Sequence, residues 1–272
     1  MNPIKANYHS HSFRCGHAFG TDEEYVQGAI KAELTSMGFS DHVILPGIHQ
    51  YGMRAEDPML PDYLESVKAL KKKYEGQIEI FTGFECEWFG PVFEGYYRDL
   101  LESGKCDYLI IGQHCCMPQF DHMRFYASYA DPDAAVKDYT KDLVAGIRSG
   151  LFSYVAHPDV IVMWFHRWNE LNEESAYAIC KAAKEMNIPL EINMSCSRFD
   201  TFDLDNPEVM LYPYPRFWEI ASEIGNDVII GVDAHQPSHY DSPYYQVFVD
   251  FAKKHRLNLL TRLPFRRPGI DF

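Results

Sequence analysis

The chain has 272 residues, of which 46% are apolar and 24% charged, and this composition excludes a disordered chain, a collagen and a coiled coil. Its 39 acidic and 25 basic residues give a net charge of −14, which argues against long nucleic acid as a partner, because such binding needs clustered lysine and arginine. Neither an apolar run of the roughly 20 residues that span a membrane nor a signal peptide is apparent, so we expect a cytoplasmic protein that makes no use of a membrane.

Seven short apolar runs are predicted to be β-strands. They cover Ala6–His9, Met37–His42, Ile78–Glu87, Tyr108–His114, Phe152–His157, Pro189–Ser195 and Val228–His235. Segments with helical periodicity separate these runs. We predict helices over Asp22–Ser36, Asp62–Tyr74, Val92–Glu102, Pro132–Ser149, Glu173–Met186, Pro215–Ile224 and Pro243–His255.

Several helix starts carry recognisable signals. Thr21 offers an N-cap hydroxyl ahead of three acidic residues, and Asn172 is expected to cap the fifth helix in the same way. Pro132 suits the first helical turn after Asp131, because its missing amide hydrogen is not needed there.

The alternation of strands and helices predicts parallel strands, because a parallel pair needs a crossover connection, which is usually a helix. Seven such units without a linker rich in proline, glycine or serine favour a single α/β domain over residues 1–272, folded as one barrel. Leu45–Pro61 and Asp200–Tyr214 are predicted to be long loops.

Polar side chains stand at or just past the carboxyl end of every predicted strand. They are His9 and His11, Asp41 and His42, Glu85 and Glu87, His114, His157, Glu191 to Ser195, and Asp233 and His235. Barrels of this kind place their active sites at the C-terminal face of the strands. We therefore expect these side chains to converge there.

The polar groups have the chemistry of metal ligands. His9 and His11 are two residues apart, as are Asp233 and His235, so in extended chain each pair points to one side. Any one histidine is better explained as a satisfied core residue, but seven of the twelve lie at matching strand ends or, like His17, in the turn that follows. Nitrogen and oxygen ligands suit zinc, iron, manganese or cobalt.

The cysteines are not needed in this ligand set. Their number, seven, is odd, no CxxC spacing occurs, and Cys115 and Cys116 are adjacent, so a disulfide framework is not expected. Cys15, Cys115 and Cys116 lie near the predicted site but are read as small apolar residues.

The ordered motifs resemble those of the PHP (polymerase and histidinol phosphatase) superfamily, most closely its histidinol-phosphatase-like members. The resemblance implies a distorted (β/α)7 barrel with a trinuclear metal site at the C-terminal face, in which the glutamate bridges ions. The implied ligands are His9, His11, His17, His42, Glu85, His114, His157, Asp233 and His235. Two or three divalent ions, zinc, iron or manganese, are expected.

The resemblance also suggests how phosphate is held. Glu191–Arg198 is similar to a family segment that ends in a phosphate-gripping arginine, and Arg198 can contact phosphate oxygens in a bidentate manner. Some family members carry another arginine shortly after the HPD motif, where this chain has Val160–Val162. Arg167 is the candidate to replace it, and Ser195 is a further candidate for the phosphate.

These residues imply a metal-dependent phosphatase. A hydroxide bridging ions held by Glu85 and Asp233 is expected to attack a small phosphate monoester, with L-histidinol phosphate the best candidate. His122 and His239 are candidates for protonating the leaving alkoxide. The alternatives are a nucleotide or oligonucleotide diester as substrate, and a non-catalytic metal-binding module. The oligomeric state is not predicted.

Overall fold

Eight parallel strands form one curved sheet in the computed structural model, which describes residues 2–120, 122–198, 203, 212–263 and 265. The strand order is β1-β2-β3-β4-β7-β8-β9-β10. The strands are β1 (Ala6–Asn7), β2 (Ser36–Phe39), β3 (Glu79–Cys86), β4 (Tyr108–Ile111), β7 (Tyr154–Val155), β8 (Leu190–Asn193), β9 (Asp227–Gly231) and β10 (Asn258–Leu259). The predicted strand–helix alternation is therefore confirmed.

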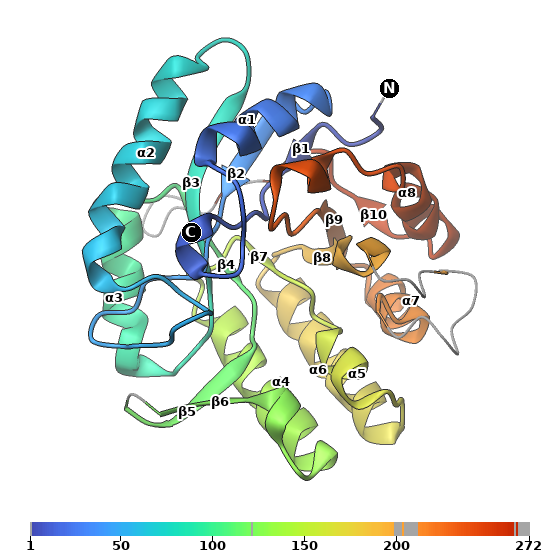
Figure 1. Cartoon of the computed structure of the whole chain (residues 1–272). Helices are drawn as coiled ribbons and strands as arrows, with labels where there is room; N and C mark the ends of the chain where they lie inside the picture. Colours follow the sequence, from blue (N-terminus) through green and yellow to red (C-terminus); the bar gives the residue numbers. More distant parts are fainter. Residues whose placement is uncertain (1, 121, 199–202, 204–211, 264, 266–272) are drawn as a thin grey trace.

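Helices cover the outer side of the sheet (Figure 1). They are α1 (Asp22–Lys31), α2 (Leu60–Lys73), α3 (Pro91–Glu102), α4 (Pro132–Arg148), α5 (Val160–Phe165), α6 (Glu170–Glu185), α7 (Pro215–Ile224) and α8 (Tyr245–Lys254). None of the helices in these described ranges is long and apolar enough to cross a bilayer.

Both faces of the strands are buried, as the predicted apolar runs require. On β4, Leu109 and Ile111 belong to the large cluster between sheet and helices, whereas Tyr108 and Ile110 pack in a smaller cluster on the other face. This alternation follows from the two-residue period of a strand. A sheet buried on both faces holds its strand ends rigidly.

The first strand of the sheet meets the next-to-last strand just beyond their carboxyl ends. Just beyond β1 and β9, Ser10 and Ala234 form a parallel bridge, and the His11 amide donates to the Ala234 carbonyl at 2.8 Å. This contact brings the first and the last predicted ligand pairs together, although more than 200 residues separate them in sequence.

Two of the three predicted helix starts are confirmed. Thr21 caps α1 in a capping box with Glu24, and Asp131 caps α4 with Pro132 in the first turn. The prediction for Asn172 was wrong as to its position. Asn169 is the cap of α6, and Asn172 returns the hydrogen bond as the third residue of that helix.

The structure adds three strands and one helix to the predicted set. An antiparallel hairpin, β5 (Cys115–Gln119) and β6 (His122–Phe125), follows β4 and lies beside α4 (Figure 1). Helix α5 follows β7, and β10 extends the sheet at the β9 edge. The predicted loop Leu45–Pro61 contains a 3-10 turn, Asp57–Met59, and α2 begins at Leu60. The other predicted loop, Asp200–Tyr214, lies largely outside the described residues.

Candidate metal centre

The nine predicted ligands meet at the carboxyl ends of the strands. Eight of them line a cavity of about 300 Å³, and they are His11, His17, His42, Glu85, His114, His157, Asp233 and His235. The ninth, His9, is fully buried behind them, with Nε2 3.5 Å from Glu85 Oε2. Residues spread over most of the chain therefore surround one space.

Glu85 is at the middle of this cluster. Five imidazole nitrogens lie between 2.7 and 3.5 Å from its two carboxylate oxygens, from His9, His11, His42, His114 and His157. Space for the carboxylate depends on Gly112 of the next strand connection, where a Cβ atom would stand 1.9 Å from Glu85 Oε1. A carboxylate in this position can contact more than one ion.

Asp233 is the second shared carboxylate. Its Oδ1 lies 3.0 Å from His11 Nε2, 3.4 Å from His9 Nε2 and 3.5 Å from His235 Nδ1. The backbone of Asp233 has φ +52° and that of His157 has φ +30°, a region that side-chain-bearing residues rarely adopt. Such strained backbone is concentrated at functional sites, where it aims a side chain.

His17 stands at the rim of the cavity. Its ring centroid lies 4.9 Å from that of His235 and 5.4 Å from that of His42. It comes from the turn after the 3-10 helix Phe13–Cys15, and burial, with the nearby His11, lowers its pKa. The turn therefore brings His17 back to the HxH pair, as predicted, with its ring centroid 6.1 Å from that of His11.

The donor set fits divalent cations. Three imidazole nitrogens beside the shared carboxylates, His9 Nε2, His11 Nδ1 and His42 Nδ1, are buried and make no hydrogen bond within the described part of the chain. Leaving such atoms unpaired is costly, whereas a coordinated cation satisfies them. Five groups of three potential ligand atoms lie within 4.8 Å of one another among the described residues. Three of them consist only of predicted ligands: His11, His42 and His235; His9, Glu85 and His157; and His9, His11 and Asp233.

Two of the imidazoles are held from behind by buried carboxylates. His9 Nδ1 lies 2.9 Å from Glu191 Oε2, and His114 Nδ1 lies 3.1 Å from Glu87 Oε1. A carboxylate on one ring nitrogen keeps the proton there and leaves the other nitrogen free to bind a metal. The sequence placed Glu87 and Glu191 at this face without assigning them this role.

The cluster has strongly shifted pKa values in the ion-free state. Burial raises the pKa of the Glu85 carboxyl, but the imidazoles around it, His114 foremost, outweigh burial and hold that pKa well below its usual range. Burial and the nearby His11 lower the pKa of His235 to about 3. Burial also lowers the pKa of His11, but the neighbouring carboxylates of Asp233 and Asp41 outweigh it and raise the value to about 9.

Ion uptake is therefore expected to tighten between pH 7 and pH 9. His11, with a pKa of about 9, carries a proton at pH 7 that a metal must displace. For each displaced proton the apparent affinity should rise up to about tenfold per pH unit and level off above the pKa. Competition with a chelator of known affinity at pH 7, 8 and 9 measures this. An affinity independent of pH over that range, once hydrolysis of the free ion is corrected for, would contradict the prediction.

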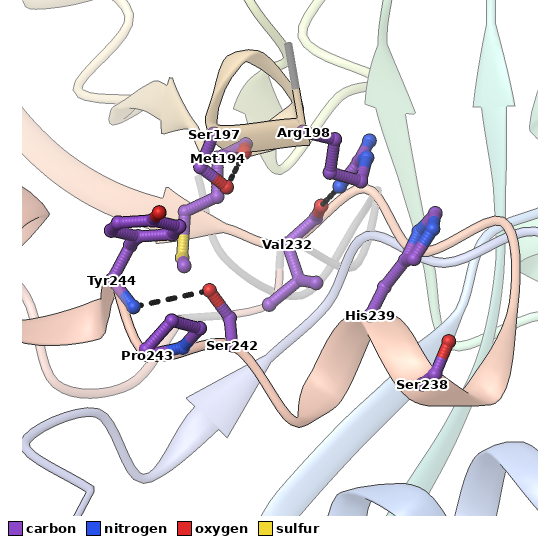
Figure 2. Close-up of a pocket in the computed structure, with 9 residues that line it drawn as sticks. All are labelled: Met194, Ser197, Arg198, Val232, Ser238, His239, Ser242, Pro243 and Tyr244. Carbon is purple, nitrogen blue, oxygen red and sulfur yellow. Dashed lines mark hydrogen bonds between the residues drawn. The ribbon is translucent and has the colours of Figure 1, made fainter. Parts of the chain in front are cut away.

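Arg198 lies beside the cluster. Its guanidinium donates to the carbonyls of Val232 at 3.0 Å and Asp233 at 3.2 Å. Figure 2 shows it with His239 in a neighbouring pocket of about 140 Å³. His239 Nδ1 accepts the backbone N–H of His235, and burial, with Arg198, lowers the pKa of His239 to about 4.

The remaining predicted residues are not among those that line the cavity. Arg167 is half-buried and paired with Asp133 at the start of α4, and it does not line the cavity. Ser195 begins the 3-10 helix that carries Arg198, and its amide donates to Asn193 Oδ1 at 2.8 Å. His122 is exposed on β6.

Comparison with protein families matches residues 7–195 to the PHP domain. The chain belongs to the PHP family. The matched range covers the predicted ligands from His9 to His157, whereas the predicted ligands Asp233 and His235 lie beyond it.

Two curated relatives span almost the same length as this chain. A protein of Deinococcus radiodurans named "Probable histidinol-phosphatase" is 30% identical over 232 residues, which cover 84% of this chain and 85% of that protein. A protein of Schizosaccharomyces pombe with the same name is 22% identical over 267 residues, 89% of this chain and 84% of that protein.

Among solved structures, histidinol phosphate phosphatase from Lactococcus lactis, in complex with zinc, L-histidinol and phosphate, superposes with a TM-score of 0.69. It is 18% identical and covers 96% of this chain and 98% of its own. This likeness supports the barrel fold. Together the comparisons confirm the predicted family, the fold and the enzyme class, a metal-dependent phosphatase.

Proposed function

We propose that the chain hydrolyses a small phosphate monoester, with L-histidinol phosphate the best candidate. The observation that carries the proposal is the convergence of nine histidine and carboxylate side chains on one cavity of about 300 Å³. The curated relatives named as histidinol-phosphatases and the zinc, L-histidinol and phosphate in the Lactococcus lactis enzyme support this choice of substrate and cofactor.

The nine residues would hold two or three divalent ions, of zinc, iron or manganese, in a chain that we propose to be one domain. Glu85 and Asp233 are the two carboxylates near several imidazoles each, so they would be the ligands that adjacent ions share. When bound, such ions make water acidic enough to lose a proton near neutral pH and offset the negative charge of a phosphate.

The protein's own groups would orient the substrate. The Arg198 guanidinium donates to the backbone carbonyls of Val232 and Asp233, which fix its position at the edge of the cluster. Its other N–H groups would then donate to a phosphate oxygen. His239 presents the nitrogen opposite to the one that accepts the His235 amide, as a fixed donor near the same arginine. With the pKa of His239 lowered to about 4, this group would donate a hydrogen bond as a neutral imidazole.

Part of the wall of the cavity is apolar. Met53 from the loop after β2, Phe125 at the end of β6 and Trp164 on α5 line the same cavity as the metal ligands. Flat aromatic surfaces favour a ring in the organic half of the substrate. The imidazole of L-histidinol phosphate meets this requirement.

Replacing Trp164 with alanine is expected to raise KM for L-histidinol phosphate by up to about tenfold, because an aromatic contact contributes roughly 0.5–1.5 kcal/mol. KM for a small aliphatic monoester such as ethanolamine phosphate should change little, and bound metal should stay at its wild-type level. Steady-state kinetics on both substrates, with elemental analysis, make the comparison. Equal effects on the two substrates would show that the ring does not contact the organic half.

The proposed function is tested by phosphate release from a panel of phosphorylated metabolites that includes L-histidinol phosphate and a nucleoside monophosphate. Para-nitrophenyl phosphate and its bis ester, each with and without chelator, separate monoesterase from diesterase activity. We expect chelator-sensitive release from monoesters, highest with L-histidinol phosphate. Preference for the diester would favour the nucleotide alternative, and release from no substrate at full metal occupancy would favour a non-catalytic module.

A further inference from the structure

A buried arginine stands behind the metal cluster, in the loop that follows β2. The side chain of Arg54 has no exposed surface, and all three guanidinium nitrogens are engaged. Nε donates to Gln50 Oε1 at 2.7 Å, Nη1 donates to the Val43 carbonyl at 2.9 Å, and Nη2 donates to Glu87 Oε2 at 2.9 Å. The guanidinium is therefore fixed in position by three acceptors.

Glu87 links Arg54 to a predicted ligand, His114. Its carboxylate is fully buried, with Oε2 on Arg54 and Oε1 3.1 Å from His114 Nδ1. Both oxygens are thus occupied, so Glu87 serves as an acceptor behind His114. The other ring nitrogen, Nε2, then lies 3.5 Å from Glu85 Oε1 with its lone pair free for an ion.

The second carboxylate behind the cluster is held differently. Glu191, which contacts His9, takes its own hydrogen bond from the amide of Asn193 at 2.6 Å, and that amide belongs to the same strand. Glu87 depends instead on an arginine from a separate loop. Removing the Arg54 guanidinium would leave the buried Glu87 carboxylate without a partner. An unpaired buried charge is costly, so the carboxylate is expected to move or to take up a proton.

We propose that Arg54 is a positioning residue for the metal centre: its guanidinium fixes Glu87 so that His114 presents Nε2 to an ion. The inference rests on the proposed metal site. It also ties the loop that carries Met53, a residue of the apolar cavity wall, to one of the ligands. Arg54 itself touches neither substrate nor ion.

The test is the affinity of the whole protein for zinc after replacement of Arg54. In Arg54→Met one of the bound ions should be held about 10–100-fold more weakly, the usual effect of losing a partner behind a ligand, while the others stay. Zinc content after dialysis at buffered free zinc, and the rate of zinc transfer to a chromogenic chelator, measure this directly. Activity lost at limiting zinc should return with excess zinc.

A double variant keeps the test valid if Arg54→Met alone fails to fold. Arg54→Met combined with Glu87→Leu removes both charges and fills the same space with apolar groups, a change that buried ion pairs often tolerate. Because the acceptor behind His114 is gone, the same ion should be weakened to a similar extent, without adding to the single effect.

Arg14→Met is the matched control. Arg14 is also buried, but its carboxylate partners, Asp22 and Asp62, contact none of the nine predicted ligands. Zinc affinity should stay at the wild-type level in this control. Unchanged zinc affinity in both Arg54 variants, or an equal loss in Arg14→Met, would overturn the proposal. A wild-type protein that binds no zinc would instead overturn the proposed function.

Discussion

Replacing Glu85 with alanine is expected to lower kcat by more than about 10³-fold and to remove much of the bound metal. The carboxylate contacts five imidazoles, so its loss leaves ligands from different strands without a common partner. Loss of one stabilising group at a reacting centre already costs about 10²–10³-fold, and here the ions that supply the stabilisation are lost as well. Phosphate release and elemental analysis on the same preparation measure both effects. Asp233→Ala should behave in the same way.

Glu79→Ala is the control for this prediction. Glu79 begins the same strand but stands at its opposite end, exposed, where it hydrogen-bonds to Ser36. Its removal should leave activity and metal content unchanged. Glu85→Gln adds a second comparison, because it keeps the size of the side chain and an acceptor for His157 but removes the charge. Wild-type rates or full metal occupancy in Glu85→Ala would refute the assignment of Glu85.

Removal of the ions by a chelator is expected to abolish activity and to lower the thermal stability of the folded protein. Ion binding satisfies buried imidazole nitrogens that have no other partner among the described residues, so it stabilises the native state over the unfolded one. At a free ion concentration of 100 times Kd the gain is about 2.7 kcal/mol. For a chain of this size that corresponds to a rise in Tm of roughly 5–10 °C.

Calorimetry on the stripped and the reloaded protein measures this shift, with elemental analysis to confirm that stripping is complete. The control is His9→Ala, which removes a ligand atom shared by two of the candidate groups and should respond less to added ions. Activity that survives complete removal of metal, or a Tm that does not respond to any of zinc, iron and manganese, would exclude a metal centre at this site.

The strand–helix order and the convergence of the polar strand ends were predictable because both follow from local patterns. Each strand is a short apolar run in the sequence. A polar residue at or just past the end of such a run, such as Glu85 or Asp233, stands out against it. The added elements were harder to predict. Pro118 removes an amide donor within β5, which β5 tolerates because it pairs with a single strand and its pairing is irregular between Cys116 and Gln119. Helix α5 consists of six residues, VIVMWF, whose β-branched and aromatic composition favours a strand.

The residues that face the site can be predicted from the order of strands and helices, since parallel strands with helical crossovers bring their carboxyl ends to one side. The pairing of those residues cannot, because it depends on contacts between distant parts of the chain. Glu191 meets His9 across 182 positions, and Arg54 meets Glu87 across 33. Such contacts depend on the register of neighbouring strands and on the path of a loop. Neither leaves a periodic trace in the sequence, because a side chain's partner is set by packing in three dimensions rather than by spacing along the chain.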